Sequence, residues 1–143
     1  MDAQRVADVL EIQQLLTAYA RAVDTKDWQR YRSVFTSDAT IDCRESPFGI
    51  VGTLEEVIGW LDAGLSALPM TMHYVMNIDS EINGDRAAVC AQFYNPMQIP
   101  GFDDLSFCGG YYHHTMIRTD NGWRSTSMRE EIRWFVNSPL AQQ

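Results

Sequence analysis

The chain has 143 residues, with 11 basic and 19 acidic side chains and a formal net charge of −8. Hydrophobic residues make up 45% and charged residues 21%, values typical of one globular domain. A chain of this length buries roughly 70% of its unfolded surface. Because the charge is acidic and no basic cluster is present, neither a nucleic acid nor an anionic membrane is expected as a partner.

Local patterns exclude further classes of protein. No apolar run is long enough to span a bilayer, and the polar start of the chain lacks the apolar core of a signal peptide. Cys43, Cys90 and Cys108 are odd in number and widely spaced, so neither a disulfide framework nor a zinc knuckle is indicated. These features predict a cytoplasmic protein.

Two helices are predicted at the start of the chain. Apolar residues recur at helical spacing over residues 3–23. Asp24 or Thr25 then caps a second helix, which ends at Ser37-Asp38, and residues 39–43 form a short strand. Asp24 has two alternative roles: it caps this second helix, or its carboxylate points back into the core from the corner between the two helices.

The rest of the chain predicts one more helix and a β-meander. Thr53 and Glu56 form a capping box, and Pro69 stops this helix near Leu68. Four segments of alternating polarity follow, at 71–82, 86–98, 105–119 and 123–135. Three helices before long antiparallel strands predict an α+β fold. The expected shape is a cone-shaped barrel in which the helices pack on a strongly curved antiparallel sheet around a pocket.

Alternation along the strands assigns side chains to the inner face of this sheet. The inner face combines apolar and aromatic groups with a few polar ones, which is the composition of a small-molecule pocket. The candidate pocket residues are Tyr19, Trp60, His73, Phe93, Asn95, Met97, Tyr112 and His114. Because neighbouring strand residues point to opposite faces, only one of His113 and His114 faces the pocket, and the sequence leaves open which.

No metal or organic cofactor is expected. His113 and His114 cannot easily share an ion, and the chain contains no other metal-ligand spacing and no nucleotide-binding fingerprint.

His73 and Asp24 are the candidate acid/base pair. An imidazole titrates near neutral pH and can both take and return a proton. An inward-pointing Asp24 would orient the ring and stabilise its cation; the alternative for His73 is a structural core or edge residue. Tyr19 lies about 140° from Asp24 around an ideal helix, so the two converge only if the helix ends or unwinds near Val23.

Several motifs resemble the scytalone dehydratase family in their order and spacing. They are Asp24–Arg32, Ile41–Arg44, Thr71–Tyr74, Gly122-Trp123 and Ile132–Trp134. This resemblance covers nearly the whole chain and identifies residues 1–143 as a single SnoaL-like domain of the nuclear-transport-factor-like superfamily.

The resemblance also implies roles for individual residues. Asp24 and His73 match the buried aspartate and the first catalytic histidine of the scytalone dehydratase family. Its second catalytic histidine falls near Met97, and its tyrosine on the first strand falls at Cys43. The resemblance to bile-acid dehydratases implies a tyrosine, aspartate and histidine trio at Tyr19, Asp24 and His73.

The expected function is that of a cofactor-independent dehydratase-type lyase on a hydrophobic, oxygenated ring compound, polyketide- or steroid-like. His73 removes the proton beside a carbonyl, Asp24 orients the imidazole, and Tyr19 donates a hydrogen bond to the developing oxyanion. His114 or Tyr112 assists the departing hydroxyl. The alternatives are an isomerase or cyclase of the same fold, or a non-catalytic ligand-binding or assembly subunit.

The outer face of the sheet predicts self-association. Phe107, Tyr111 and Ile117 are too apolar to stay in water on a single-layer sheet, so a homodimer or homotrimer is expected.

Overall fold

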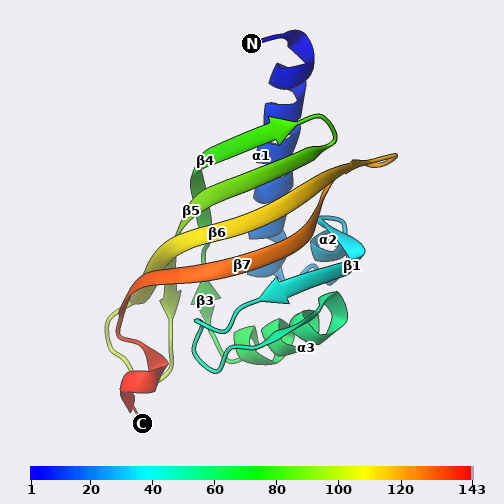
Figure 1. Cartoon of the computed structure of the whole chain (residues 1–143). Coiled ribbons are helices and arrows are strands. Elements are labelled where there is room, and N and C mark those ends of the chain that lie inside the picture. The colour runs from blue at the N-terminus through cyan, green and yellow to red at the C-terminus, as the bar shows by residue number, and fades with distance from the viewer. Residues whose placement is uncertain (143) are drawn as a thin grey trace.

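The computed structural model describes residues 1–142, and α1 (Ala3–Thr25) runs across one face of a curved, seven-stranded sheet (Figure 1). The helix begins at Asp2, whose side chain accepts a hydrogen bond from the backbone N–H of Arg5 at 2.8 Å. It ends at Lys26, whose φ of 57° is the left-handed conformation common at helix ends. Asp24 therefore lies inside the last turn of α1 and caps no second helix.

The second helix is shorter than predicted. Asp27 caps α2 (Trp28–Arg32) by accepting a hydrogen bond from the N–H of Arg30 at 3.1 Å. The backbone then becomes extended, because the carbonyl of Val34 accepts a hydrogen bond from Ser125 of the last strand at 2.9 Å. As a result β1 (Phe35–Asp42) begins before the expected helix end at Ser37-Asp38.

The third helix begins as predicted. β2 (Val51–Thr53) leads directly into α3 (Leu54–Leu65). Thr53 Oγ1 accepts a hydrogen bond from the N–H of Glu56, and the Glu56 side chain accepts one from the N–H of Thr53. The capping box is thus complete. In residues 1–142, no helix is both long and apolar enough to cross a membrane.

The predicted meander is present, with one interruption. Its strands are β3 (Met70–Thr71), β4 (Tyr74–Asn83), β5 (Arg86–Gln98), β6 (Ser106–Thr119) and β7 (Gly122–Val136), followed by the short helix η1 (Pro139–Gln142). The break between β3 and β4 contains Met72 and His73, within the segment expected to be one continuous strand. Met72 still donates its N–H to the carbonyl of Pro96 at 3.0 Å, which keeps the break against β5.

The sheet order is β2-β1-β7-β6-β5-β3, with β4 also paired to β5. β1 lies parallel to β7, with Ile41 opposite Met128, whereas the other pairs are antiparallel. The sheet is therefore mixed, where a fully antiparallel one was expected. The predicted α+β cone is otherwise confirmed: α1 passes behind the long strands and α3 lies beside β1 (Figure 1).

Packed aromatic rings fill part of the space between α1 and the sheet. The ring of Tyr19 lies 5.6 Å from Tyr31 and 5.2 Å from Tyr112, and Tyr31 lies 5.1 Å from Phe35. All four side chains are buried. This cluster closes one end of the interior, and the remaining space forms the cavity.

Candidate active site

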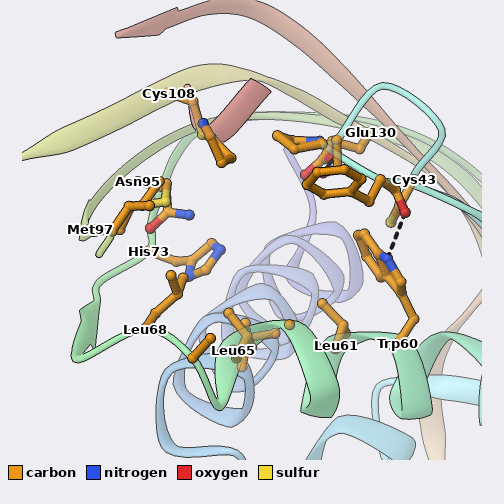
Figure 2. Close-up of a pocket in the computed structure, with 18 of the residues that line it drawn as sticks. Cys43, Trp60, Leu61, Leu65, Leu68, His73, Asn95, Met97, Cys108 and Glu130 are labelled. Atoms are coloured by element: carbon orange, nitrogen blue, oxygen red, sulfur yellow. Dashed lines mark hydrogen bonds between the residues drawn. The ribbon is translucent and has the colours of Figure 1, made fainter. Parts of the chain in front are cut away.

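A cavity of about 570 Å³ lies between α3, the end of α1 and the inner face of the sheet. Its walls are mostly apolar. Figure 2 shows His73, Asn95 and Met97 on one side of this space, and Cys43, Trp60 and Glu130 on the other. The few polar groups in the lining are Tyr19, Ser46, His73, Asn95, Tyr112 and Glu130. An apolar space with a few separated polar groups suits a ring compound of limited polarity.

Asp24 and His73 are in direct contact at two points. Oδ1 of Asp24 lies 2.6 Å from Nδ1 of the ring, and Oδ2 accepts a hydrogen bond from the backbone N–H of His73 at 2.8 Å. The side chain of His73 is 8% exposed and that of Asp24 is 19% exposed, so water has little access to the pair. The carboxylate fixes the rotation of the ring and leaves Nε2 as the nitrogen available for chemistry.

The helix does not unwind near Val23, so Tyr19 and Asp24 do not converge on the cavity. α1 stays helical through Thr25, and both Tyr19 and Val23 line the cavity. Asp24 lies behind His73 and is not among the lining residues. The two meet because the break between β3 and β4 brings the backbone of His73 to the end of α1.

The side-chain amide of Asn95 reaches the other ring nitrogen of His73. When Nε2 of His73 is protonated, the amide oxygen can accept its hydrogen at 3.1 Å, and the two hydrogens of the amide nitrogen then face the carbonyls of Met72 and Pro96 at 3.2 Å each and Thr71 Oγ1 at 2.8 Å. The opposite orientation would point the amide oxygen at two carbonyl oxygens. Asn95 therefore shares Nε2 with the cavity, and a substrate must approach Nε2 beside this amide.

Tyr19 and Tyr112 supply hydroxyl groups that keep their protons. Burial raises the pKa of both phenols well above the ordinary value, and a hydrogen bond with Tyr19 only partly opposes the shift at Tyr112. The ring of Tyr112 stacks on Phe93 at 4.3 Å with an interplanar angle of 11°. Both phenols are thus held as neutral hydrogen-bond donors in the lining.

Two expected pocket residues lie outside the lining. Phe93 sits behind Tyr112, whose stacked ring separates it from the cavity. His114 is 3% exposed and packs against Tyr19, and its Nδ1 lies 2.8 Å from Ser125 Oγ. Burial lowers the pKa of His114 to about 3, so it stays neutral. His113 faces the other side of the sheet, with Nε2 3.0 Å from Glu131.

The other expected pocket residues are in place. Trp60, Met97 and Tyr112 line the cavity together with Tyr19, His73 and Asn95. The indole Nε1 of Trp60 donates a hydrogen bond to the carbonyl of Phe48 at 2.9 Å, seen as the dashed line in Figure 2. This bond ties the loop before β2 to α3, so the loop forms a fixed wall.

Glu130 is a lining residue that the sequence did not indicate. It lies on β7 opposite Tyr112 and is 9% exposed. Ser46 Oγ donates a hydrogen bond to its Oε1. Burial raises the pKa of Glu130, and the Ser46 hydrogen bond and the charge of His73 oppose the rise. The cavity therefore contains a second ionisable group facing the side occupied by His73.

The described part of the chain offers no metal-binding cluster. Among residues 1–142, no three His, Cys, Asp or Glu side chains are grouped to hold an ion. The lining thiols are poor ligands in their resting form, because burial raises the pKa of Cys108 to about 12 and that of Cys43 well above its ordinary value.

Comparison with known proteins supports the fold and relates the chain to a family. The SnoaL-like domain matches residues 4–129. The uncharacterized protein Rv2910c of Mycobacterium tuberculosis is 35% identical over 125 residues, which cover 87% of this chain and 84% of that protein. The crystal structure of Kfla4162 from Kribbella flavida has a TM-score of 0.84 and 27% identity, and the match covers 99% of this chain and 100% of that one.

Two further solved structures share the fold at lower identity. A scytalone dehydratase-like protein from Novosphingobium aromaticivorans has a TM-score of 0.82 at 14% identity, covering 96% of this chain and 91% of its own. The hexachlorocyclohexane dehydrochlorinase LinA-type3 from Novosphingobium barchaimii has a TM-score of 0.81 at 18% identity, covering 95% and 93%. These likenesses confirm the predicted cone-shaped fold.

Proposed function

This chain belongs to the SnoaL-like family, and from that membership and the chemistry of its cavity we propose that it is a cofactor-independent lyase. Its reaction is the loss of water from a hydrophobic, oxygenated ring compound. The observation that carries the proposal is the two-point contact between Asp24 and His73 at the wall of an apolar cavity. A buried carboxylate that orients an imidazole is an arrangement suited to general base catalysis.

The first step is removal of a proton next to a carbonyl group. Nε2 of the neutral His73 ring takes the proton, while the hydrogen that the ring already carries lies on Nδ1 and is bonded to Asp24. The amide oxygen of Asn95, 3.1 Å from Nε2, can then accept the hydrogen that Nε2 has gained. The carboxylate stabilises the imidazolium that forms. The negative charge moves to the carbonyl oxygen, where a neutral phenol of the Tyr19 and Tyr112 pair donates a hydrogen bond. Expulsion of a hydroxyl group from the next carbon then completes the elimination.

The volume of the cavity suits a substrate that contains a single ring or several fused rings. This volume of about 570 Å³ lies within the range of small-molecule sites. Met97, Trp60 and the α3 side chains offer apolar contact, which favours binding by roughly 25 cal/mol per Å² of apolar area removed from water. The polar groups are few enough that they determine orientation more than affinity.

Proton exchange into a simple ketone tests the proposal. We expect the protein to catalyse deuterium uptake at the carbon beside the carbonyl of α-tetralone in deuterated water, measured by mass spectrometry. His73→Ala should lower the exchange rate by roughly 10²–10⁴-fold while binding stays within a few fold. His113→Ala, on the opposite face of the sheet, is the matched control.

The same assay separates the alternatives. An isomerase or cyclase shares the first proton transfer and differs in its product, whereas a non-catalytic ligand-binding or assembly subunit gives no exchange. Binding of α-tetralone with an exchange rate that His73→Ala does not change would overturn the proton-transfer mechanism.

A further inference from the structure

We propose that Glu130 is the proton donor of this cavity: it holds its proton in the free protein and gives it to the departing hydroxyl group, while His73 takes the carbon-bound proton. This inference rests on the proposed function, because it names the second proton-transfer group of the same site. It assigns a catalytic role to a residue within a charged run, Arg129-Glu130-Glu131, that gives no sign of a buried side chain.

Glu130 is placed where a substrate can reach it. It lies on the inner face of β7 opposite Tyr112, and both residues line the cavity. Figure 2 shows Glu130 and His73 on different walls of the same space. A ring compound in this space can therefore present its carbon-bound proton to one wall and its hydroxyl group to the other.

The surroundings of Glu130 disfavour its ionised form. Ser46 is its only hydrogen-bond partner among residues 1–142, and within the same range no cation forms an ion pair with it. An ionised carboxylate buried without a cation carries a large desolvation penalty, which protonation removes. Burial raises the pKa of this carboxyl and the neighbouring charge of Glu45 adds to the rise, while Ser46 and His73 oppose it.

The other candidates for this proton transfer are unsuitable. His114 lies outside the lining and stays neutral. Tyr19 and Tyr112 keep their protons because burial raises each pKa well above its ordinary value, so they donate hydrogen bonds without transferring a proton. Cys43 and Cys108 are held as thiols for the same reason. Within the described part of the chain, Glu130 carries the only carboxyl group among the lining residues.

The proposed reaction balances without a co-reactant. Nε2 of His73 accepts the proton from carbon, and the electrons of that C–H bond form the new carbon–carbon double bond. The C–O bond breaks with its electron pair on oxygen, and the proton of Glu130 joins this oxygen to give water. The imidazolium of His73 then returns a proton to the Glu130 carboxylate through the released water, which restores both groups.

A purely structural role is the alternative, in which Glu130 only holds Ser46 and its loop. Infrared spectroscopy of the free protein separates the two. We expect the C=O stretching band of a protonated carboxylic acid at neutral pH, shifted by ¹³C-labelled glutamate and lost in Glu130→Gln. Ser46→Ala should keep this band to higher pH, because the Ser46 hydrogen bond lowers the pKa. Glu131→Gln, on the same strand, should leave the band unchanged. A Glu130 that is ionised at neutral pH overturns the proposal.

The leaving group provides the functional test. A hydroxyl group needs a proton to depart and acetate does not. We expect Glu130→Gln to slow the dehydration of β-hydroxy-α-tetralone by roughly 10²–10⁴-fold. Loss of acetate from β-acetoxy-α-tetralone and deuterium exchange into α-tetralone should stay within a few fold of the wild type. The amide oxygen of this variant can still accept the hydrogen bond from Ser46, so the loop keeps its anchor.

The possible outcomes distinguish the two proposals. Two results with Glu130→Gln would overturn the donor role alone, provided that deuterium exchange is retained. In one, the variant dehydrates β-hydroxy-α-tetralone as fast as the wild type. In the other, it slows the loss of hydroxide and the loss of acetate equally. A wild type that shows neither exchange nor elimination overturns the proposed function, and the donor role with it.

Discussion

Both carboxylate oxygens of Asp24 contact one residue: Oδ1 meets the ring of His73, and Oδ2 accepts its backbone N–H. The ring contact concerns proton transfer, while the backbone contact joins the end of α1 to the break between β3 and β4. One side chain therefore has a chemical role and a structural role, and two substitutions can separate them.

Asp24→Asn should separate chemistry from folding. The amide oxygen can still accept the backbone N–H of His73, so thermal denaturation should stay within a few degrees of the wild type. The neutral amide cannot stabilise an imidazolium, so deuterium exchange into α-tetralone should fall strongly. Asp24→Ala removes both contacts and should also lower the free energy of unfolding by about 1–3 kcal/mol. Equal activity in Asp24→Asn and the wild type would contradict the ring role.

Local signals predicted the turns and the third helix. The capping box at Thr53 needs only Glu56 three residues later, and the structure contains both of its hydrogen bonds. The hairpin at Asn83-Gly84 likewise depends on a short sequence, and Gly84 adopts a φ of 62° there. Such features form from neighbouring residues and are visible in any reading of the sequence.

Glu130 was missed because a register shift reverses the alternation along β7. Trp123 and Ser125 face inward, so strict alternation places Glu130 on the outer face. Ser125 pairs with Met116 and Ser127 with Thr115, which leaves one extra residue on β7. This bulge turns Glu130 inward. The parallel pairing of β1 with β7 was missed for a different reason: it joins residues that are distant in the sequence.

The pairing of Asp24 with His73 was expected from the family resemblance and from the place of Asp24 at the corner between two predicted helices. Hydrophobic periodicity alone could not decide between this pairing and a capping role for Asp24. Helical periodicity could not show that α1 continues past Asp24, because Lys26 ends the helix with a left-handed φ that carries no strong sequence signal.

Phe93→Ala should lower stability more than ligand binding. Phe93 is 4% exposed and lies behind Tyr112. Truncation of a buried phenylalanine should reduce the free energy of unfolding by about 3–5 kcal/mol, measured by urea denaturation. Met97→Ala, in the cavity lining, should weaken binding of α-tetralone with a smaller loss of stability than Phe93→Ala. The reverse order would show that Phe93 contacts the ligand.

Acid should weaken the ion pair between Asp8, near the start of α1, and Arg118 of β6. Arg118 donates to Asp8 at 2.7 and 3.0 Å, and this pairing, with a hydrogen bond from Trp123, holds the pKa of Asp8 well below its ordinary value of 3.8. Since the folded-state pKa is depressed, the stabilisation is fully present above 3.8 and is lost as the pH falls toward the folded-state value. Asp8→Asn should cost about 1–3 kcal/mol at neutral pH, and its difference from the wild type should shrink in acid. A difference that does not depend on pH would contradict the ion-pair role.

Self-association through the outer face of the sheet is the remaining prediction. Tyr74 of β4, Tyr94 of β5 and Trp134 of β7 form a row across the sheet, with ring separations of 5.9 and 6.0 Å, and each is 39–47% exposed. The Trp134 ring lies flat over Gly109, where an added Cβ would come within 2.4 Å of it. Phe107 extends the row through its contact with Trp134, and it is half-buried, as are Tyr111 and Ile117, which were also expected at the interface.

A second copy of the chain is the expected partner of this row, because a face that is apolar across adjacent strands can pair with itself through a two-fold axis. Light scattering at micromolar concentration should give a dimer or trimer for the wild type. Tyr94→Asp with Trp134→Asp should shift it to the monomer, because each charge would be buried in the interface without a partner. Leu10→Asp, at an exposed apolar site on α1, is the matched control and should leave the mass unchanged. A monomeric wild type would rule out this interface.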